Sequence, residues 1–136
     1  MLKGLNWTAV LVSAVLLEAL GYLWYGPLFG KLWTAAMGPA AANGHQTLAM
    51  ALGVVNTLIL VIGLAWLLRR LGASALTAAV AGALAAWFFF DFTTMAVDYL
   101  YESRSLTVVG INMGYQLVAY LLAGVILGVL KPKPAL

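Results

Sequence analysis

The sequence predicts an all-α integral membrane protein, in which four transmembrane helices form a bundle and a short interfacial helix follows the first. The chain of 136 residues is 65% apolar and only 8% charged, whereas soluble domains are about half apolar and about a quarter charged. A spanning helix needs about 20 predominantly apolar residues, and four such runs fit this chain with little left over. We therefore expect a single transmembrane domain with no soluble domain attached.

The first helix is predicted over residues 5–28, where Gly26-Pro27 stops it. Residues 29–37 contain Lys31 among apolar and aromatic side chains, which is typical of a short helix in the membrane interface. Glycine, proline and polar residues over 38–45 then predict a loop.

Three further helices are predicted over residues 47–68, 73–95 and 106–130. Arg69-Arg70 follows the first of these, and a lysine- and proline-containing stretch follows the last. The end of the third transmembrane helix stays open, because apolar residues dominate to residue 95 while helical character continues to Glu102.

Basic residues indicate the orientation of the bundle in the membrane. One side carries most of them and the other has only Lys31 and Arg104. By the positive-inside rule, this asymmetry predicts a multi-pass protein with both termini in the cytoplasm. The basic residues on the predicted cytoplasmic side are Lys3, Arg69, Arg70, Lys131 and Lys133.

Aromatic residues lie at the predicted helix ends, where the helices meet the boundary between membrane and water. Tryptophan and tyrosine are enriched where a membrane meets water, because their rings are apolar and their N–H or O–H groups remain wet. This favours interface anchors over a ligand-binding aromatic box for Trp7, Trp24, Tyr25 and Trp33.

Acidic and amide side chains inside the apolar segments predict a polar centre within the membrane. At about 1.5 Å of rise per residue, Glu18, Asn56 and Gln116 lie roughly 18–21 Å from the cytoplasmic side and share a layer. Asp91 and Asn112 lie in a second layer, roughly 27 Å from that side. A carboxyl group in hydrocarbon is costly and by default marks a functional site.

Two interpretations of this centre remain open. In the first, a protonated Glu18 and the amides hydrogen-bond across helices and only fix the bundle. In the second, Glu18 exchanges a proton or binds a cation, with the amides as partners. Asp98 and Glu102 are expected to be surface loop charges, with Arg104 as a partner.

Glycines on the last transmembrane helix predict a close helix contact, either within the bundle or at a dimer interface. Two G-x-x-x-G spacings fall on the side opposite Asn112 and Gln116, and such spacings let helix backbones approach closely. The residues concerned are Gly110, Gly114, Gly124 and Gly128.

The sequence offers little material for catalysis or for holding a cofactor. It has no cysteine, and its single histidine, His45, has no second metal-ligand type nearby. No serine has a histidine in register for a triad. We therefore expect no catalytic residue, no metal site and no cofactor, and a membrane-embedded enzyme is the remotest alternative.

Several motifs resemble a family of small bacterial membrane proteins catalogued as domain of unknown function 1761. The run Trp24-Tyr25-Gly26-Pro27-Leu28-Phe29-Gly30-Lys31-Leu32-Trp33 is similar to its signature, as are residues 101–106, 111–118 and 124–128. The resemblance covers essentially the whole chain and is weakest in the second transmembrane helix. It implies a four-helix protein of the bacterial inner membrane, without an established activity or catalytic residues to transfer.

Three functions follow as alternatives. The expected one is a non-enzymatic bundle with a structural polar core, with the lipid bilayer and a homodimer or another membrane protein as partners, and no nucleic acid. The second is a small proton- or cation-coupled transporter centred on Glu18. Small multidrug exporters offer a loose analogy for it, since they have four helices and a glutamate in the first, but their other motifs are absent. The third is the membrane-embedded enzyme.

Overall fold

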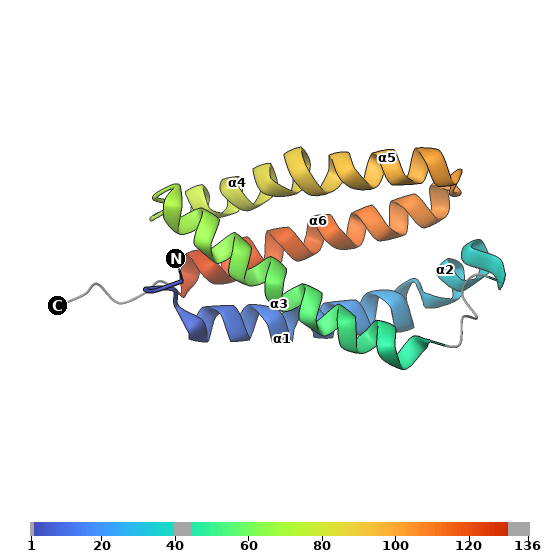
Figure 1. The fold of residues 1–136 in the computed structure, drawn as a ribbon, viewed down its shortest axis with the longest axis horizontal. Coiled ribbons are helices and arrows are strands. Elements are labelled where there is room, and N and C mark those ends of the chain that lie inside the picture. The colour runs from blue at the N-terminus through green and yellow to red at the C-terminus, as the bar shows by residue number, and fades with distance from the viewer. Residues whose placement is uncertain (1, 40–44, 131–136) are drawn as a thin grey trace.

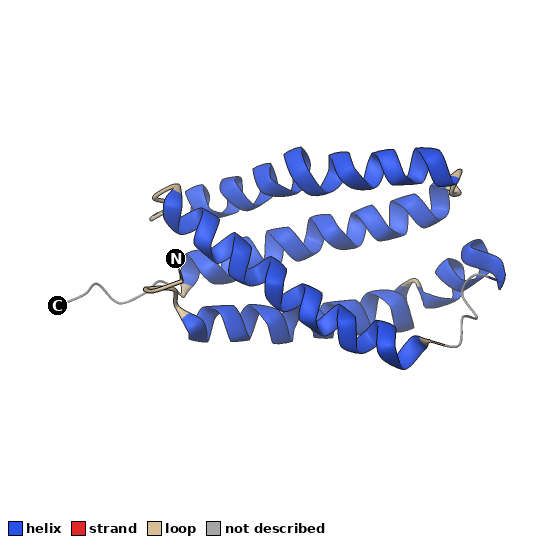
Figure 2. Ribbon diagram, in the orientation of Figure 1, coloured by secondary structure: helices blue, strands red, loops and turns tan. Residues whose placement is uncertain are grey.

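The computed structural model describes residues 2–39 and 45–130, and these residues form helices joined by short turns, without a β-strand among them (Figures 1 and 2). Four helices are long and apolar enough to cross a membrane. A short helix follows the first of them. The predicted fold class, an all-α bundle of four long apolar helices, is therefore confirmed.

The first long helix consists of α1 (Trp7–Leu23) and a π-helical turn, η1 (Trp24–Leu28). The side-chain oxygen of Asn6 caps α1 by accepting a hydrogen bond from the backbone N–H of Ala9 at 3.2 Å. Pro27 lies inside η1, where its missing N–H and its ring disturb the regular hydrogen-bond ladder. The short helix α2 (Gly30–Met37) begins directly afterwards, close to the predicted interfacial segment.

The second long helix is α3 (Gln46–Arg70), and it ends with the arginine pair that the sequence places there. Gly72 has a positive φ of 64° in the turn that follows, a conformation that glycine adopts without a steric penalty. The predicted loop before α3 falls mostly on residues 40–44, which lie outside the described residues.

The third long helix extends beyond the predicted end at residue 95. It comprises α4 (Leu76–Ala86), a π-helical turn η3 (Trp87–Phe92) and α5 (Thr93–Glu102). The expectation that Asp98 and Glu102 are loop charges is therefore wrong, because both lie on α5. The expected partner is correct, since Arg104 forms an ion pair with Glu102 at 2.8 Å.

The last long helix, α6 (Leu106–Val129), packs along α4 and also against α1, whereas α3 crosses α1 obliquely (Figure 1). Small residues line the contact between α4 and α6. A Cβ atom on Gly124 would lie 2.7 Å from that of Ala83, and one on Gly128 would lie 3.0 Å from that of Ala79. These two glycines therefore allow the close approach of α4 and α6 within the bundle.

The other two glycines of the predicted contact have different surroundings. A Cβ atom on Gly114 would meet the Trp24 ring at 3.3 Å, and one on Gly110 would meet nothing within 4 Å. The first half of α3, residues 46–56, is exposed at every position. Only the second half of α3 contributes to the core, through Val61, Leu64 and their neighbours.

Candidate functional site

A cavity of about 360 Å³ opens between α3, η3 and α6. Three of its lining residues, Asn56, Asp91 and Gln116, belong to the predicted polar centre, and each comes from a different helix. Tyr120 adds a fourth polar side chain. The rest of the lining is apolar and consists of Ile59, Leu60, Gly63, Leu64, Leu67, Ala86 and Phe90.

Helix periodicity explains how these residues reach one cavity. Gln116 and Tyr120 are four residues apart on α6 and therefore share one face of that helix. On α3, Asn56 and Gly63 also share one helix face, together with the lining residues that lie between them at helical spacing. Asp91 lies in the π-helical turn η3, and such turns, which insert into an α-helix and re-aim side chains, are frequent at functional sites.

The carboxyl group of Asp91 is the chemically distinctive part of the cavity. Its Oδ2 atom is buried and has no hydrogen-bond partner among the described residues. Burial of an ionised carboxylate without a partner is costly, so such a group takes up a proton or pairs with a cation. The cavity therefore combines a group that can change its charge with the amide side chains of Asn56 and Gln116, which can donate or accept hydrogen bonds.

Glu18, the expected centre, does not line this cavity. Its side chain is exposed, and it lies on α1 near the buried residues Ala14 and Leu17. Within the described part of the chain it forms neither a hydrogen bond nor an ion pair. The structure thus separates Glu18 from Asn56 and Gln116, although the three were expected to form one group.

Asn112 belongs to a second polar group, at the other end of α6 from the glycine contact. Its Oδ1 atom accepts hydrogen bonds from the Tyr25 hydroxyl at 2.9 Å and from the Trp33 indole N–H at 3.0 Å. Its Nδ2 atom donates to the Tyr99 hydroxyl at 3.0 Å. We call Asn112 with Tyr25, Trp33 and Tyr99 the Asn112 cluster.

The Asn112 cluster connects η1, α2, α5 and α6 and is surrounded by aromatic rings. The ring centroid of Tyr25 lies 5.6 Å from that of Trp33 and 5.3 Å from that of Tyr115. Nearby, the Trp24 indole N–H donates to the Ile111 carbonyl at 2.9 Å. The polar groups here are satisfied by protein partners, which is how a structural polar cluster stabilises a helix bundle.

Three of the four residues expected to anchor the chain in the interface thus form hydrogen bonds to α6. They are Trp24, Tyr25 and Trp33, whereas Trp7 is 47% exposed. The sequence interpretation missed Tyr99, Tyr115 and Tyr120 as functional candidates. The available signal was tyrosine itself, which combines an apolar ring with a hydroxyl and usually finds a partner when buried.

In the described residues, no group of three or more histidine, cysteine, aspartate or glutamate side chains is arranged to hold a metal ion. His45, immediately before α3, has no side-chain capping hydrogen bond. In the Asp91 cavity, a carboxyl group meets the amide and tyrosine side chains of Asn56, Gln116 and Tyr120.

Comparison with known proteins agrees with the resemblance seen in the motifs. A family model described as protein of unknown function (DUF1761) matches residues 8–128. The matched range contains both the polar cavity and the Asn112 cluster. No similar protein was found among the curated proteins or the solved structures. The chain, matched over nearly its whole length, belongs to the DUF1761 family.

Proposed function

We propose that the chain is a non-enzymatic protein of the bacterial inner membrane that binds a proton or a small cation at Asp91 and transfers it along the cavity. The single observation that carries this proposal is the buried, unpartnered carboxylate oxygen of Asp91 in a cavity with two amide side chains. Ionisable residues within spanning helices commonly mark ion or proton pathways.

The contrast with a purely structural centre supports this assignment. A residue that only holds helices together has its hydrogen bonds satisfied by other helices, as Asn112 does. Asn56, Gln116 and Asp91 have no side-chain hydrogen bond among the described residues and face an open volume instead. The transport function considered for Glu18 therefore moves to Asp91 in our proposal.

The orientation with both termini in the cytoplasm is part of the proposal. The end of the bundle near the N-terminus carries Lys3, Arg69 and Arg70, which favours its cytoplasmic location. Ser74→Cys and Ser103→Cys lie in turns at opposite ends of the third long helix. In intact cells, an impermeant thiol reagent should label Ser103→Cys and not Ser74→Cys, and the reverse pattern would overturn the orientation.

Assembly with a second copy is a further part of the proposal. Glu18 is exposed on a helix that is otherwise apolar, and an acid facing hydrocarbon is costly. A homodimer, or another membrane protein that covers this face of α1, would remove the acid from the lipid. Native mass spectrometry should show a dimer for the wild type and fewer dimers for Glu18→Leu, and a monomer for both would reject the homodimer.

Ion transfer is tested in liposomes that contain the purified protein. We expect an imposed pH gradient, or a gradient of K⁺ or Na⁺, to decay faster than in empty liposomes. Asp91→Asn keeps the shape of the side chain and removes its charge, so it should lower this rate at least about tenfold. Glu18→Gln is the matched control, since it neutralises an acid of another long helix that does not line the cavity, and it should leave the rate within about twofold.

Two results would contradict the proposal. One is a decay rate in wild-type liposomes equal to that in empty liposomes for all three ions. The other is a loss of transport in Glu18→Gln with full transport in Asp91→Asn, which would return the function to Glu18.

A further inference from the structure

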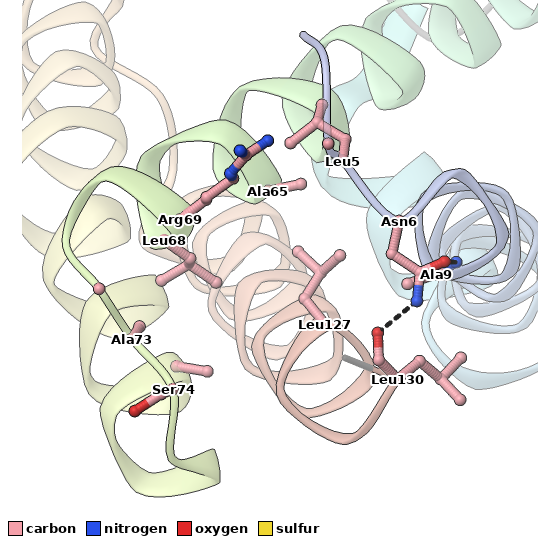
Figure 3. A pocket seen from close by; sticks show the side chains of 13 residues that line it. Leu5, Asn6, Ala9, Ala65, Leu68, Arg69, Ala73, Ser74, Leu127 and Leu130 are labelled. Atoms are coloured by element: carbon pink, nitrogen blue, oxygen red, sulfur yellow. Dashed lines mark hydrogen bonds between the residues drawn. The ribbon is translucent and has the colours of Figure 1, made fainter. Parts of the chain in front are cut away.

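A second cavity, of about 320 Å³, lies at the end of the bundle where α1 and α4 begin and α3 and α6 end (Figure 3). Its volume falls within the range of small-molecule sites, about 300–1,000 Å³. The lining is mostly apolar, and its larger side chains are Leu5, Leu68, Leu127 and Leu130. Six alanines and glycines leave the space open, and the other lining residues are Asn6, Arg69 and Ser74.

The rim of this cavity is basic. Arg69 contributes to the lining, and one N–H of its guanidinium donates to the Lys3 carbonyl. Figure 3 shows this guanidinium directed toward Leu5, at the opening between the N-terminal segment and α3. The four acidic residues of the chain all lie elsewhere, and none of them lines the cavity. No carboxylate side chain of the described residues therefore neutralises Arg69 at this cavity.

The start of α4 lies beside the same cavity. Ser74 and Ala79 line it, and the helix begins between them with Ala75 as its N-cap residue. Ala75 has no side chain that can cap the helix, so the first backbone N–H groups of α4 have no side-chain acceptor. Such N–H groups and the positive end of the helix dipole favour an anion.

We propose that this cavity binds one anionic phospholipid of the surrounding leaflet. Its phosphate would pair with Arg69, and part of an acyl chain would fill the leucine-lined interior. An apolar interior beneath a basic rim, at the ends of membrane-spanning helices, matches the two halves of such a lipid. The proposal is independent of ion transfer at Asp91, which lines the other cavity.

Arg70 provides a matched control for Arg69. Arg70 is adjacent to Arg69 in the sequence and has the same charge, but it does not line the cavity. Its guanidinium lies 5.6 Å from the Trp66 ring centroid. A lipid held by general attraction to the basic end of the bundle would respond equally to the loss of either charge. A lipid held in the cavity would respond mainly to the loss of Arg69.

The experiment uses the full chain, stripped of lipid in a neutral detergent. Native mass spectrometry would measure binding of phosphatidylglycerol and of phosphatidylcholine with the same acyl chains. We expect phosphatidylglycerol to bind at least about tenfold more tightly to the wild type, and Arg69→Gln to lower that affinity about tenfold. Arg70→Gln should lower it less than about threefold, the scale of general attraction to one basic residue.

A second variant tests the apolar part of the site and does not depend on Arg69. Ala73 lines the cavity and is only partly buried, so Ala73→Phe should fill the cavity and abolish tight phosphatidylglycerol binding while both arginines remain. Circular dichroism would show that each variant retains its helices. Inorganic phosphate is the third probe, because it offers the anion without the chain, and it should compete only weakly with the lipid.

Each remaining outcome rejects the proposal. Equal losses in Arg69→Gln and Arg70→Gln would indicate general electrostatic attraction. Undiminished binding in Ala73→Phe would place the lipid outside the cavity. Equal affinities for the two lipids would remove the role of the charge, and displacement by low concentrations of inorganic phosphate would indicate a site for soluble anions.

Discussion

Asn112 and Asp91 are both polar residues in apolar helices, yet their surroundings differ. Asn112 uses both ends of its amide, accepting from Tyr25 and Trp33 and donating to Tyr99. Asp91 lines a cavity of about 360 Å³, and its Oδ2 atom is buried without a partner in the described chain. The difference teaches that polarity within a span does not by itself separate two kinds of residue: one whose hydrogen bonds are satisfied by other helices, as for Asn112, and one whose buried oxygen has no protein partner, as for Asp91.

The largest effect on stability is expected from Asn112→Leu. The substitution removes three hydrogen bonds and leaves the Tyr25 hydroxyl and the Trp33 N–H without their acceptor. We expect a loss of about 2–4 kcal/mol in the free energy of unfolding, measured by denaturant titration in detergent micelles. Asn56→Leu is the matched control, because Asn56 lies at the cavity, and it should change stability by less than about 0.5 kcal/mol. Equal losses would remove the distinction between the two regions.

A somewhat smaller effect is expected from Gly124→Leu, which tests whether the close contact between α4 and α6 is rigid. A Cβ atom at Gly124 would lie 2.7 Å from the Ala83 Cβ, so the helices must separate. We expect a loss of about 1–3 kcal/mol by the same titration. Gly110→Leu introduces the same side chain where nothing lies within 4 Å and should leave stability within about 0.5 kcal/mol. If Gly124→Leu is as stable as Gly110→Leu, the contact between α4 and α6 adapts to the larger side chain and is not rigid.

Tyr25→Phe should have the smallest effect on stability, because it deletes one hydroxyl of the Asn112 cluster and keeps the ring. The Asn112 oxygen still accepts from Trp33, so the expected loss is about 0.5–1.5 kcal/mol in thermal or denaturant unfolding. Tyr22→Phe deletes the same group from a side chain that is 76% exposed, and no change is expected. Identical behaviour of the two variants would mean that the Tyr25 hydroxyl contributes nothing.

Much of the fold could be predicted from the sequence because hydropathy and helix ends are local properties. Arg69-Arg70 ends α3 as expected, and four apolar runs became four long helices. The end of the third long helix was left open between residue 95 and Glu102, because Asp98 and Glu102 suit a loop as well as the end of a helix, and the structure has the longer helix. Its length depends on the positive φ of 51° at Ser103, which ends the helix and leaves no clear trace in hydropathy.

The site was predicted only in part, and the reason is physical. Asn56, Asp91 and Gln116 meet at one cavity, but Glu18 does not join them. A spanning helix is apolar on all sides, so its sequence does not reveal which face points inward. The Asn112 cluster was missed because its contacts join residues up to 87 positions apart, and side-chain spacing along one helix carries no information about such pairs.

The most direct test of the difference between the Asp91 cavity and the Asn112 cluster is to measure whether water reaches each of them in a lipid membrane. The chain has no cysteine, so single cysteines can be placed freely. Gly63→Cys lines the Asp91 cavity and has space for the added side chain, whereas Gly114→Cys adjoins the Trp24 ring near the Asn112 cluster. Val15→Cys, at a position that is 66% exposed on the outer face of α1, controls for contact with lipid. We expect a small water-soluble thiol reagent to modify Gly63→Cys at least about tenfold faster than the other two variants in liposomes, since only thiolates in contact with water react. Equal rates at all three positions would contradict the assignment of Asp91 to an open site and of Asn112 to a dry structural contact.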